Sequence, residues 1–295
     1  MDHKEFLAGL DLRVKMELTS KSDEAGLRHL AGHLGAICLL GLWIGLGGPL
    51  WWALIPVQGV LIIFLFTLEH EATHKTPFDN ETLNEWVGRA CGFMILLPFE
   101  WFRYFHLAHH RWTNIEGHDP ELVGGKPETL RAWLWHVTGI PYWVAQGKLF
   151  WGLTQGTVTA PYLPESALPR IYREAELMAA GYALVAFTLL FSPFLLWAWL
   201  VPVLFGQPFL RAYLLAEHGD CERVENMFFN TRTTLTNAIV RFLAWNMPYH
   251  VEHHVFPQVP FHKLPRLHQE VQQHLKITNE GYIDFTKEYL GRRAW

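Results

Sequence analysis

The sequence predicts an all-α integral membrane protein, with four transmembrane helices in two hairpins and a cytoplasmic helical cap. Three observations lead to this fold class: long uncharged stretches, turn residues that divide them, and the position of the charges. Half of the 295 residues are hydrophobic and only 18% are charged. Charged residues make up about a quarter of an average soluble protein, so the composition already favours a membrane protein.

Two stretches, residues 30–68 and 177–210, contain no Lys, Arg, Asp or Glu. A transmembrane helix needs about 20 apolar residues, so each stretch is long enough for two spans. Turn residues divide the first stretch at 47–49 (GGP) and the second near Ser192 and Pro193. We therefore expect transmembrane hairpins over residues 30–69 and 175–215. Hydrophobic core helices of a soluble protein are the alternative, and the length of both stretches argues against it.

The remaining segments are expected to join the hairpins in a single domain, residues 1–295. They are a cytoplasmic arm (1–29), a cytoplasmic and interfacial segment (70–174) and a cytoplasmic cap (216–295). Because the turns inside both hairpins are uncharged, the positive-inside rule places these segments in the cytoplasm. Residues 130–153, rich in Trp, are expected to form a helix at the membrane interface. The bacterial inner membrane is the expected location, with the endoplasmic reticulum as the alternative.

Charge and cysteine content narrow the remaining classes. The formal net charge of -4 argues against a nucleic-acid partner. The three cysteines, Cys38, Cys91 and Cys221, lack the CxxC spacing of redox and zinc sites, so we expect them to be structural or incidental.

Three short motifs concentrate the histidines: HEATH at 70–74, HLAHH at 106–110 and HVEHH at 250–254. On a helix, residues three and four apart share a face, so the imidazoles of each motif converge. Asn246 and Pro248 are expected to cap and begin the helix of the third motif. His70 comes after the first hairpin and His218 after the second, so the motifs lie together at the cytoplasmic mouth of the bundle.

The number of histidines indicates two metal ions. The candidate ligands are His70, His74, His106, His109, His110, His218, His250, His253 and His254. One zinc uses three or four protein ligands, so nine histidines suit two metals with four or five nitrogens each. Carboxylates often orient such imidazoles through hydrogen bonds. The candidates for this role, with one amide, are Glu71, Asp119, Glu217, Asp220, Asn246 and Glu252.

Three other interpretations of the histidines explain the pattern less well. A solvated helix face explains one pair, but not a repeated HxxHH. A metal transporter would place ionisable residues inside the spans, where we find only His33. A haem protein needs two to four axial histidines, fewer than the motifs hold.

These motifs resemble those of the integral-membrane fatty acid desaturase family, bacterial type, which shares them with membrane hydroxylases and ketolases. The matching residues are HEATH (70–74), HLAHH (106–110) and NMPYHVEHHVFPQVPFHKLPRLH (246–268). The resemblance implies that the cap holds two irons, that the nine histidines are catalytic ligands, and that His218 is the ligand that comes after the fourth helix. The first motif is shorter than that of acyl-CoA desaturases, which leaves the substrate open.

The resemblance further implies an O2-dependent di-iron desaturase that introduces a double bond into a lipid acyl chain. A separate electron donor of the ferredoxin or cytochrome b5 type is expected, because the chain contains no flavin, haem or iron–sulfur motif. Arg111, Lys263 and Arg266 are candidates for its docking patch. The alternative is a membrane di-iron hydroxylase or ketolase that acts on a lipid or carotenoid. A non-enzymatic haem or metal-binding membrane protein is the distant alternative.

Overall fold

The computed structural model describes residues 2–293, which fold almost entirely into helices. The α-helices are α1 (His3–Gly9), α2 (Leu12–Leu18), α3 (Asp23–Gly45), α4 (Trp51–Ile63), α5 (Leu65–Thr73), α6 (Glu81–Ile95), α7 (Phe99–Trp112), α8 (Leu130–Val137), α9 (Ile140–Thr154), α10 (Leu168–Thr188), α11 (Val201–His218), α12 (Met227–Asn230), α13 (Ala238–Leu243), α14 (His250–Val255), α15 (Leu264–Val271) and α16 (Tyr282–Gly291). Short 3-10 turns are η1 (Pro120–Leu122), η2 (Glu165–Ala167) and η4 (Phe261–Lys263), and η3 (Leu196–Leu200) is a π-helix. The strands β1 (Thr233–Thr234) and β2 (Thr278–Asn279) pair in parallel.

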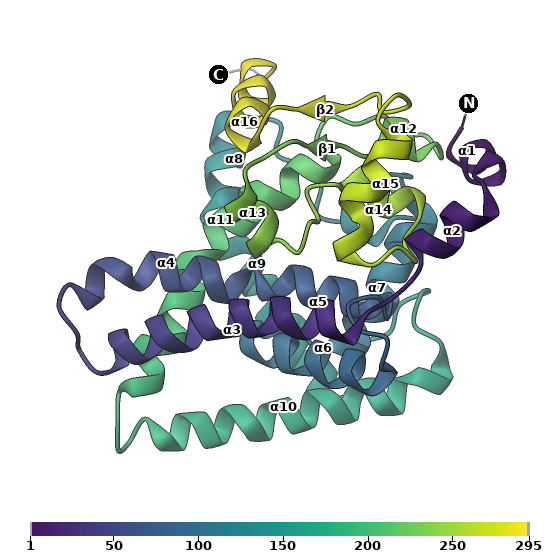
Figure 1. Cartoon of the computed structure of the whole chain (residues 1–295). Helices are drawn as coiled ribbons and strands as arrows, with labels where there is room; N and C mark the ends of the chain where they lie inside the picture. The colour runs from purple at the N-terminus through teal and green to yellow at the C-terminus, as the bar shows by residue number, and fades with distance from the viewer. Residues whose placement is uncertain (1, 294–295) are drawn as a thin grey trace.

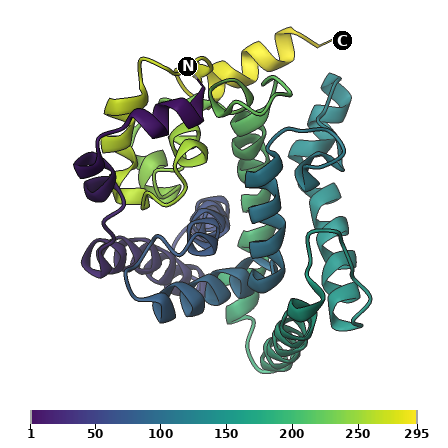
Figure 2. The same ribbon diagram turned by 90° about the vertical axis from the view of Figure 1, so that its right-hand side faces the viewer.

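The long helices and the short helices occupy different parts of the molecule. Helices α3 and α4 lie side by side with α10 running along the same direction, while α14, α15 and α16 gather on one side of them (Figure 1). Turned by 90°, the structure shows α8 and α9 in line at the edge of the molecule (Figure 2). The chain crosses repeatedly between the long helices and the short ones, so distant segments meet at their junction.

Three helical stretches are long and apolar enough to cross a membrane: Leu12–Gly45, Trp51–Thr73 and Leu196–His218. The first span of the second predicted hairpin, which starts at residue 175, corresponds to the second half of α10. The first half of α10 carries charged residues such as Arg170 and Glu174, which leaves a shorter apolar part. A helical membrane protein is thus confirmed, whereas the count of four spans stays a prediction.

The first hairpin leads directly to the first histidine motif. Helix α3 begins at the Ser22 cap, whose side chain accepts a hydrogen bond from the Ala25 amide. It ends at Gly45, and Gly47 takes the left-handed conformation (φ 70°) that the turn to α4 requires. Helix α4 continues through Phe64 into α5 without leaving the bundle, so His70 lies in the last turns of one long stretch.

Helices α4 and α11 touch through their backbones. A Cβ atom added to Gly59 would lie 2.2 Å from the Pro202 carbonyl oxygen, and one added to Gly206 would lie 2.1 Å from the Gly59 carbonyl oxygen. Only glycine permits this approach. Because α4 leads to His70 and α11 ends at His218, the glycine contact fixes the distance between the two segments that enter the site.

A network of partly buried ion pairs joins α6, α7 and α10. Arg89 contacts three carboxylates: Glu85 at 2.7 Å, Glu100 at 2.5 Å and Glu174 at 3.4 Å. Arg103 also pairs with Glu85 and Glu100. Each carboxylate has a cationic partner, which is the condition under which buried charges are tolerated. The network holds the helix of the second histidine motif against its two neighbours.

The aromatic stretch predicted as one interfacial helix is broken in two. Helix α8 ends at Val137 and α9 starts at Ile140, because Gly139 takes a left-handed conformation (φ 73°) against the side chain of Gln207 on α11. Trp135 and Trp151 are exposed on these helices, as expected for residues that face a membrane.

The third histidine motif forms the six-residue helix α14. The prediction that Asn246 caps this helix and that Pro248 begins it is wrong. Tyr249 occupies the cap position without a side-chain hydrogen bond, and Asn246 lies in a left-handed turn (φ 58°). Instead of a cap, tertiary packing holds α14, since all six of its residues are buried.

Candidate metal centre

Four helices bring the nine predicted histidines together. His70 lies in α5 and His74 ends that helix, while His106, His109 and His110 lie in α7. His218 is the last residue of α11, and α14 carries the third motif. Seven of the nine side chains are buried, and His74 and His110 are half-buried. The structure therefore gathers every predicted ligand into one cluster.

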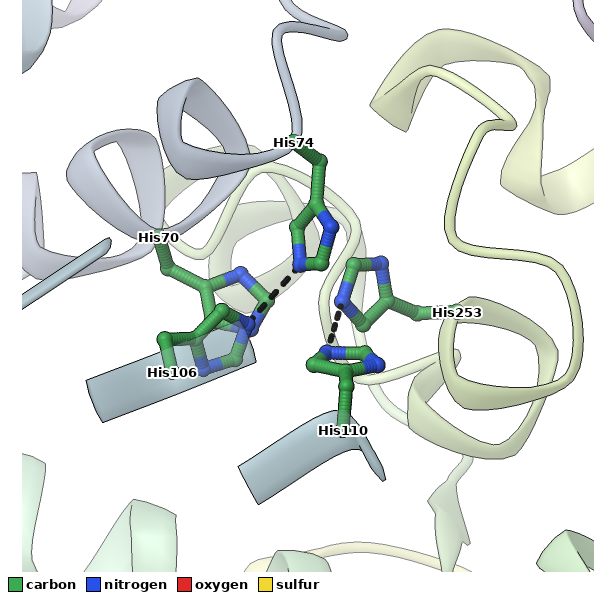
Figure 3. A group of neighbouring side chains, drawn as sticks. All are labelled: His70, His74, His106, His110 and His253. Atoms are coloured by element: carbon green, nitrogen blue, oxygen red, sulfur yellow. Dashed lines mark hydrogen bonds between the residues drawn. The ribbon is translucent and has the colours of Figure 1, made fainter. Parts of the chain in front are cut away.

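The larger part of the cluster is a five-histidine group: His70, His74, His106, His110 and His253 (Figure 3). One ring nitrogen from each lies within 4.8 Å of those of the others. The Nε2 atoms of His74 and His106 are 2.8 Å apart, and those of His110 and His253 are 3.1 Å apart. Both ring nitrogens of His70 are buried without a hydrogen-bond partner among residues 2–293.

The other part is a four-histidine group formed by His109, His218, His250 and His254. The nitrogens of His109, His218 and His254 lie within 4.8 Å of one another. Nε2 of His250 is 3.1 Å from Nε2 of His218 and 3.1 Å from Nε2 of His254. Together the two groups use all nine histidines, and each group draws on residues from both α7 and α14.

Burial and mutual repulsion keep most of these imidazoles neutral. Loss of solvation, with a smaller contribution from neighbouring histidines, lowers the pKa of His74 to about 3 and that of His110 and His253 well below 6.5. The pKa values of His106, His250 and His254 fall in the same direction for the same reason. A neutral imidazole has a free lone pair, which is the form that binds a metal ion.

His109 is the exception. Burial acts to lower its pKa, but the carboxylates of Glu121 and Asp119 together raise it. Both carboxylate oxygens of Asp119 lie 3.0 Å from Nδ1 of His109, and Oε2 of Glu121 lies 3.6 Å from the same atom. Asp119 therefore fixes the proton on Nδ1 and turns Nε2 toward the other histidines.

Three predicted acids contact the histidines. Besides Asp119, Glu71 lies 3.5 Å from Nδ1 of His253, and Glu217 lies 3.4 Å from Nδ1 of His250. The other three candidates contact different groups. Asp220 pairs with Arg292 and Arg293, Asn246 donates to the Phe261 carbonyl, and Glu252 accepts hydrogen bonds from His268 and Thr233.

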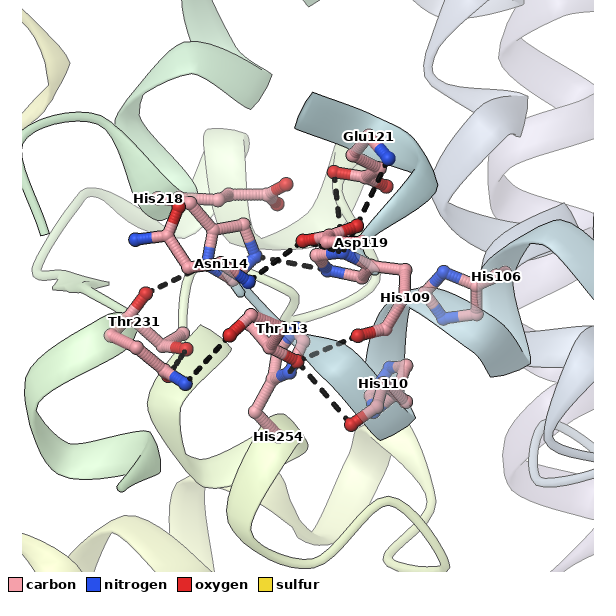
Figure 4. Close-up of polar contacts among 12 residues, drawn as sticks. His106, His109, His110, Thr113, Asn114, Asp119, Glu121, His218, Thr231 and His254 are labelled. Carbon is pink, nitrogen blue, oxygen red and sulfur yellow. Dashed lines mark hydrogen bonds and ion pairs between the residues drawn. The ribbon is translucent and has the colours of Figure 1, made fainter. Parts of the chain in front are cut away.

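Thr113 (Figure 4) and Asn230, which were not predicted from the sequence, also contact histidines. The hydroxyl oxygen of Thr113 lies 3.1 Å from Nδ1 of His254, and the Asn230 carbonyl oxygen lies 3.0 Å from Nδ1 of His218. Thr113 comes within three residues of the second motif, and this proximity is a usable signal. Asn230 lies twelve residues beyond His218, and nothing in the sequence marks it.

The donor set fits two metal ions. Imidazole nitrogens suit iron, copper and zinc, and the two groups supply five and four of them. The buried nitrogens of His70, and Nδ1 of His250 and His253, have no hydrogen-bond partner within the described part of the chain. Buried polar atoms are normally paired, so the unpaired nitrogens of His70, within a group whose ring nitrogens lie so close together, indicate a place for a cation.

A cavity of about 1220 Å³ lies against the face of α7 that points away from its three histidines, and we call it the α7 groove. Tyr104, Leu107, Ala108 and Arg111 line one wall, and residues from 114–126, among them Asp119 and Lys126, line another. Asp119 links the groove to His109. Of the predicted docking residues, only Arg111 lines the groove, whereas Arg266 pairs with Glu17 and Glu270.

Comparison with known proteins gives consistent matches. A family model described as "Fatty acid desaturase" matches residues 47–286. The chain is 23% identical to an sn-1 oleoyl-lipid 12-desaturase of Picosynechococcus over 272 residues, covering 81% of this chain and 75% of the relative. It is 23% identical to an sn-1 acyl-lipid omega-3 desaturase (ferredoxin) of Synechocystis, covering 82% and 72%. A sphingolipid delta(4)-desaturase/C4-monooxygenase of Mus musculus is 25% identical and covers 66% and 58%.

Proposed function

Because this chain belongs to the fatty acid desaturase family, we propose that it introduces a double bond into the acyl chain of a membrane lipid, using two iron ions held by the nine histidines. Membership of the family makes the chain an oxidoreductase that desaturates fatty acids. The relatives named as acyl-lipid desaturases support a complex lipid as the substrate.

In this proposal the five-histidine group holds one iron and the four-histidine group holds the other. Bound iron would supply the activation of O2 that an unreactive C–H bond requires. The reaction removes two hydrogens from adjacent carbons, while O2, two external electrons and two protons complete the formation of two water molecules.

The side chains of this protein hold and orient the histidines. Asp119 keeps a proton on Nδ1 of His109 and leaves its Nε2 free for the metal. Glu71 and Glu217 lie near Nδ1 of His253 and His250, at 3.5 and 3.4 Å. The buried setting excludes water, which strengthens the electrostatic interactions within the site. Both functions require the four helices to keep their places.

The membrane arrangement is also proposed. We place four spans in the bilayer, with α10 completing the second hairpin, and the histidines on the cytoplasmic side of a bacterial inner membrane. The three apolar stretches support this arrangement. A separate donor of the ferredoxin or cytochrome b5 type would supply the electrons, and the ferredoxin in one relative's name favours the first type.

Cysteine labelling tests the topology. In a background in which Cys38 and Cys221 are replaced by serine, Gly48→Cys and Ser192→Cys should react with an impermeant reagent from outside the cell. Lys4→Cys and Glu222→Cys should react only after the cells are opened. Outside labelling of Glu222→Cys would instead indicate an odd number of spans before residue 222.

The observation that carries the proposed function is that nine histidines form two groups in which the ring nitrogens lie close to one another. Mass spectrometry of lipids from a host that expresses the chain and a ferredoxin tests it. Acyl chains should lose the mass of two hydrogens, and the His254→Ala variant should abolish this change. His118→Ala is the matched control, because His118 is exposed and lies outside both groups.

One relative supports a second candidate, hydroxylation, because its name combines a desaturase with a C4-monooxygenase. Both reactions begin by removing one hydrogen, and small differences in position determine whether a second hydrogen leaves or oxygen is added. The same measurement separates them: a hydroxylase adds one oxygen to the acyl chain. If iron-loaded, folded protein with its donor leaves acyl lipids unchanged, a carotenoid becomes the next substrate to test.

A further inference from the structure

We propose that the two metal positions are unequal: the four-histidine group holds its iron tightly, and the five-histidine group exchanges its iron with solution. This inference rests on the proposed di-iron function. The difference arises from the groups behind the rings, on the side away from the metal.

In the four-histidine group, three rings have a hydrogen-bond partner at Nδ1, and a carboxylate lies close to Nδ1 of the fourth, His250. The partners are the Asp119 carboxylate for His109 (3.0 Å), the Asn230 carbonyl for His218 (3.0 Å), the Thr113 hydroxyl for His254 (3.1 Å) and the Glu217 carboxylate for His250 (3.4 Å). Each hydrogen bond fixes which ring nitrogen carries the proton and which way the ring faces.

These partners are themselves held in place (Figure 4). The Asn114 amide donates to Asp119 at 2.7 Å, and the side chain of Asn230 donates to the Thr113 carbonyl at 3.0 Å. Lys126 donates to both Asn114 and the His218 carbonyl. A connected hydrogen-bond network of this kind restricts the rings that it contacts, so His109, His218 and His254 are oriented before a metal arrives.

The five-histidine group has much less support. Only His253 has a carboxylate near Nδ1, Glu71 at 3.5 Å. The hydrogen bonds of His74, His106 and His110 connect them to other rings of the group. Within residues 2–293, neither nitrogen of His70 has a partner. These rings must be oriented by the metal itself, which weakens the gain from binding it.

Exposure favours the same assignment. His74 and His110 are half-buried, whereas all four members of the other group are buried. A metal ion or a chelator therefore reaches the five-histidine group first. Five donors against four favour the larger group, but loss of a single partner behind a ligating histidine typically changes metal affinity about 10- to 100-fold. Three such partners outweigh one additional ring.

Timed removal of iron tests the inference. Full-length protein in detergent, loaded with two equivalents of Fe²⁺, is mixed with excess coloured chelator under argon. We expect one equivalent to leave in a fast phase and one in a slow phase. Asp119→Asn should accelerate the slow phase about 10- to 100-fold, Asp119→Glu should restore part of the difference, and Glu71→Gln should alter only the fast phase.

Two further variants keep the test decisive. Asp284→Asn removes an exposed acid of α16 and should leave both phases unchanged. If Asp119→Asn does not fold, Thr113→Val removes the hydroxyl behind His254 at nearly constant volume and should also accelerate the slow phase.

Release of both irons in one phase, or acceleration of only the fast phase by Asp119→Asn, would overturn the inference. Failure of the proposed function has a different signature, because such a protein would bind fewer than two irons or leave lipids unchanged in the mass spectrometer.

Discussion

His74 and His109 belong to the same histidine cluster, yet their pKa values shift in opposite directions. Burial lowers the pKa of His74 to about 3, whereas the carboxylates of Glu121 and Asp119 raise that of His109. A histidine with a lowered pKa stays neutral in the fold and accepts a proton only when the chain unfolds. In the cluster, histidines with a lowered pKa outnumber His109, whose pKa is raised.

Acidification should therefore destabilise the iron-free protein. As pH falls below 6.5, the unfolded chain binds protons that the buried rings refuse, so the free energy of unfolding decreases toward pH 3. His109 contributes in the opposite direction, because its raised pKa favours the fold below 6.5. We expect the Tm of the iron-free protein, measured by circular dichroism in detergent, to be lower at pH 5 than at pH 7.5. An equal or higher Tm at pH 5 would contradict this balance.

Glu252 offers a second test on a single side chain. Its buried carboxylate accepts hydrogen bonds from His268 and Thr233, which connects α14 to α15 and β1. Glu252→Ala leaves both donors without that acceptor, and we expect it to lower the free energy of unfolding by about 1–3 kcal/mol. Glu270→Ala, which removes a partly exposed partner of Arg266, should cost less than about 1 kcal/mol. Equal losses in thermal unfolding would show that the Glu252 contacts add little.

The sequence predicted which histidines lie together far better than it predicted the groups behind them. The histidines could be predicted because they lie in repeated motifs. Glu71 and Glu217 could be predicted because each is next to a predicted ligand in the sequence. Asn230 could not, since its carbonyl reaches His218 only through the loop after α11. Asp220 adjoins the same loop but turns away to Arg293. Proximity in sequence places a side chain near a site without fixing its direction.

At the scale of the elements, hydrophobic stretches predicted the helical hairpins, and local backbone conformation decided the details. Gly139 breaks the aromatic stretch into α8 and α9, although its composition continues unchanged. The charged start of α10 extends that helix back to Leu168, well before the apolar stretch begins. The break at Gly139 leaves the hydropathy of its stretch unchanged, and the charged start of α10 lies outside the uncharged stretch that was used to predict the span.

The contact between α4 and α11 predicts a specific sensitivity to one methyl group. Gly59→Ala would place a Cβ atom 2.2 Å from the Pro202 carbonyl oxygen, so the helices must separate. We expect a loss of about 1–3 kcal/mol in thermal unfolding, together with weaker iron binding because His70 and His218 move apart. Gly35→Ala in α3 is the control: nothing lies within 4 Å of its added Cβ, and alanine favours a helix by up to about 1 kcal/mol. If Gly59→Ala and Gly35→Ala had the same stability and iron binding, the glycine contact would not determine the spacing of α4 and α11.

At the scale of the whole molecule, the site joins helices that are distant in sequence. The clustered histidines come from α5, α7, α11 and α14, so metal bound as proposed would cross-link these four helices. An ion that binds only the folded state stabilises it by about 2.7 kcal/mol at 100 times its Kd.

Removal of iron with a chelator should therefore lower the Tm of the whole protein and not only of the cap. The measurement is thermal unfolding before and after removal, with the fluorescence of the 14 tryptophans as a signal from the whole chain. His254→Ala should show a smaller change, because it has lost one ligand. A Tm that is indifferent to iron would show that the packed helices alone determine stability.

The distribution of ligands along the chain also sets an order of events during synthesis. Both groups include residues of α14, so neither is complete until residue 254 has left the ribosome. About 180 residues separate His70 from that point, which takes roughly 10–40 s at usual translation rates. The histidines of α5 and α7 are therefore made well before those of α14. In the proposed di-iron site, a complete set of ligands would exist only after α14 has packed against α5 and α7, and the partly exposed His74 and His110 lie nearest to solvent.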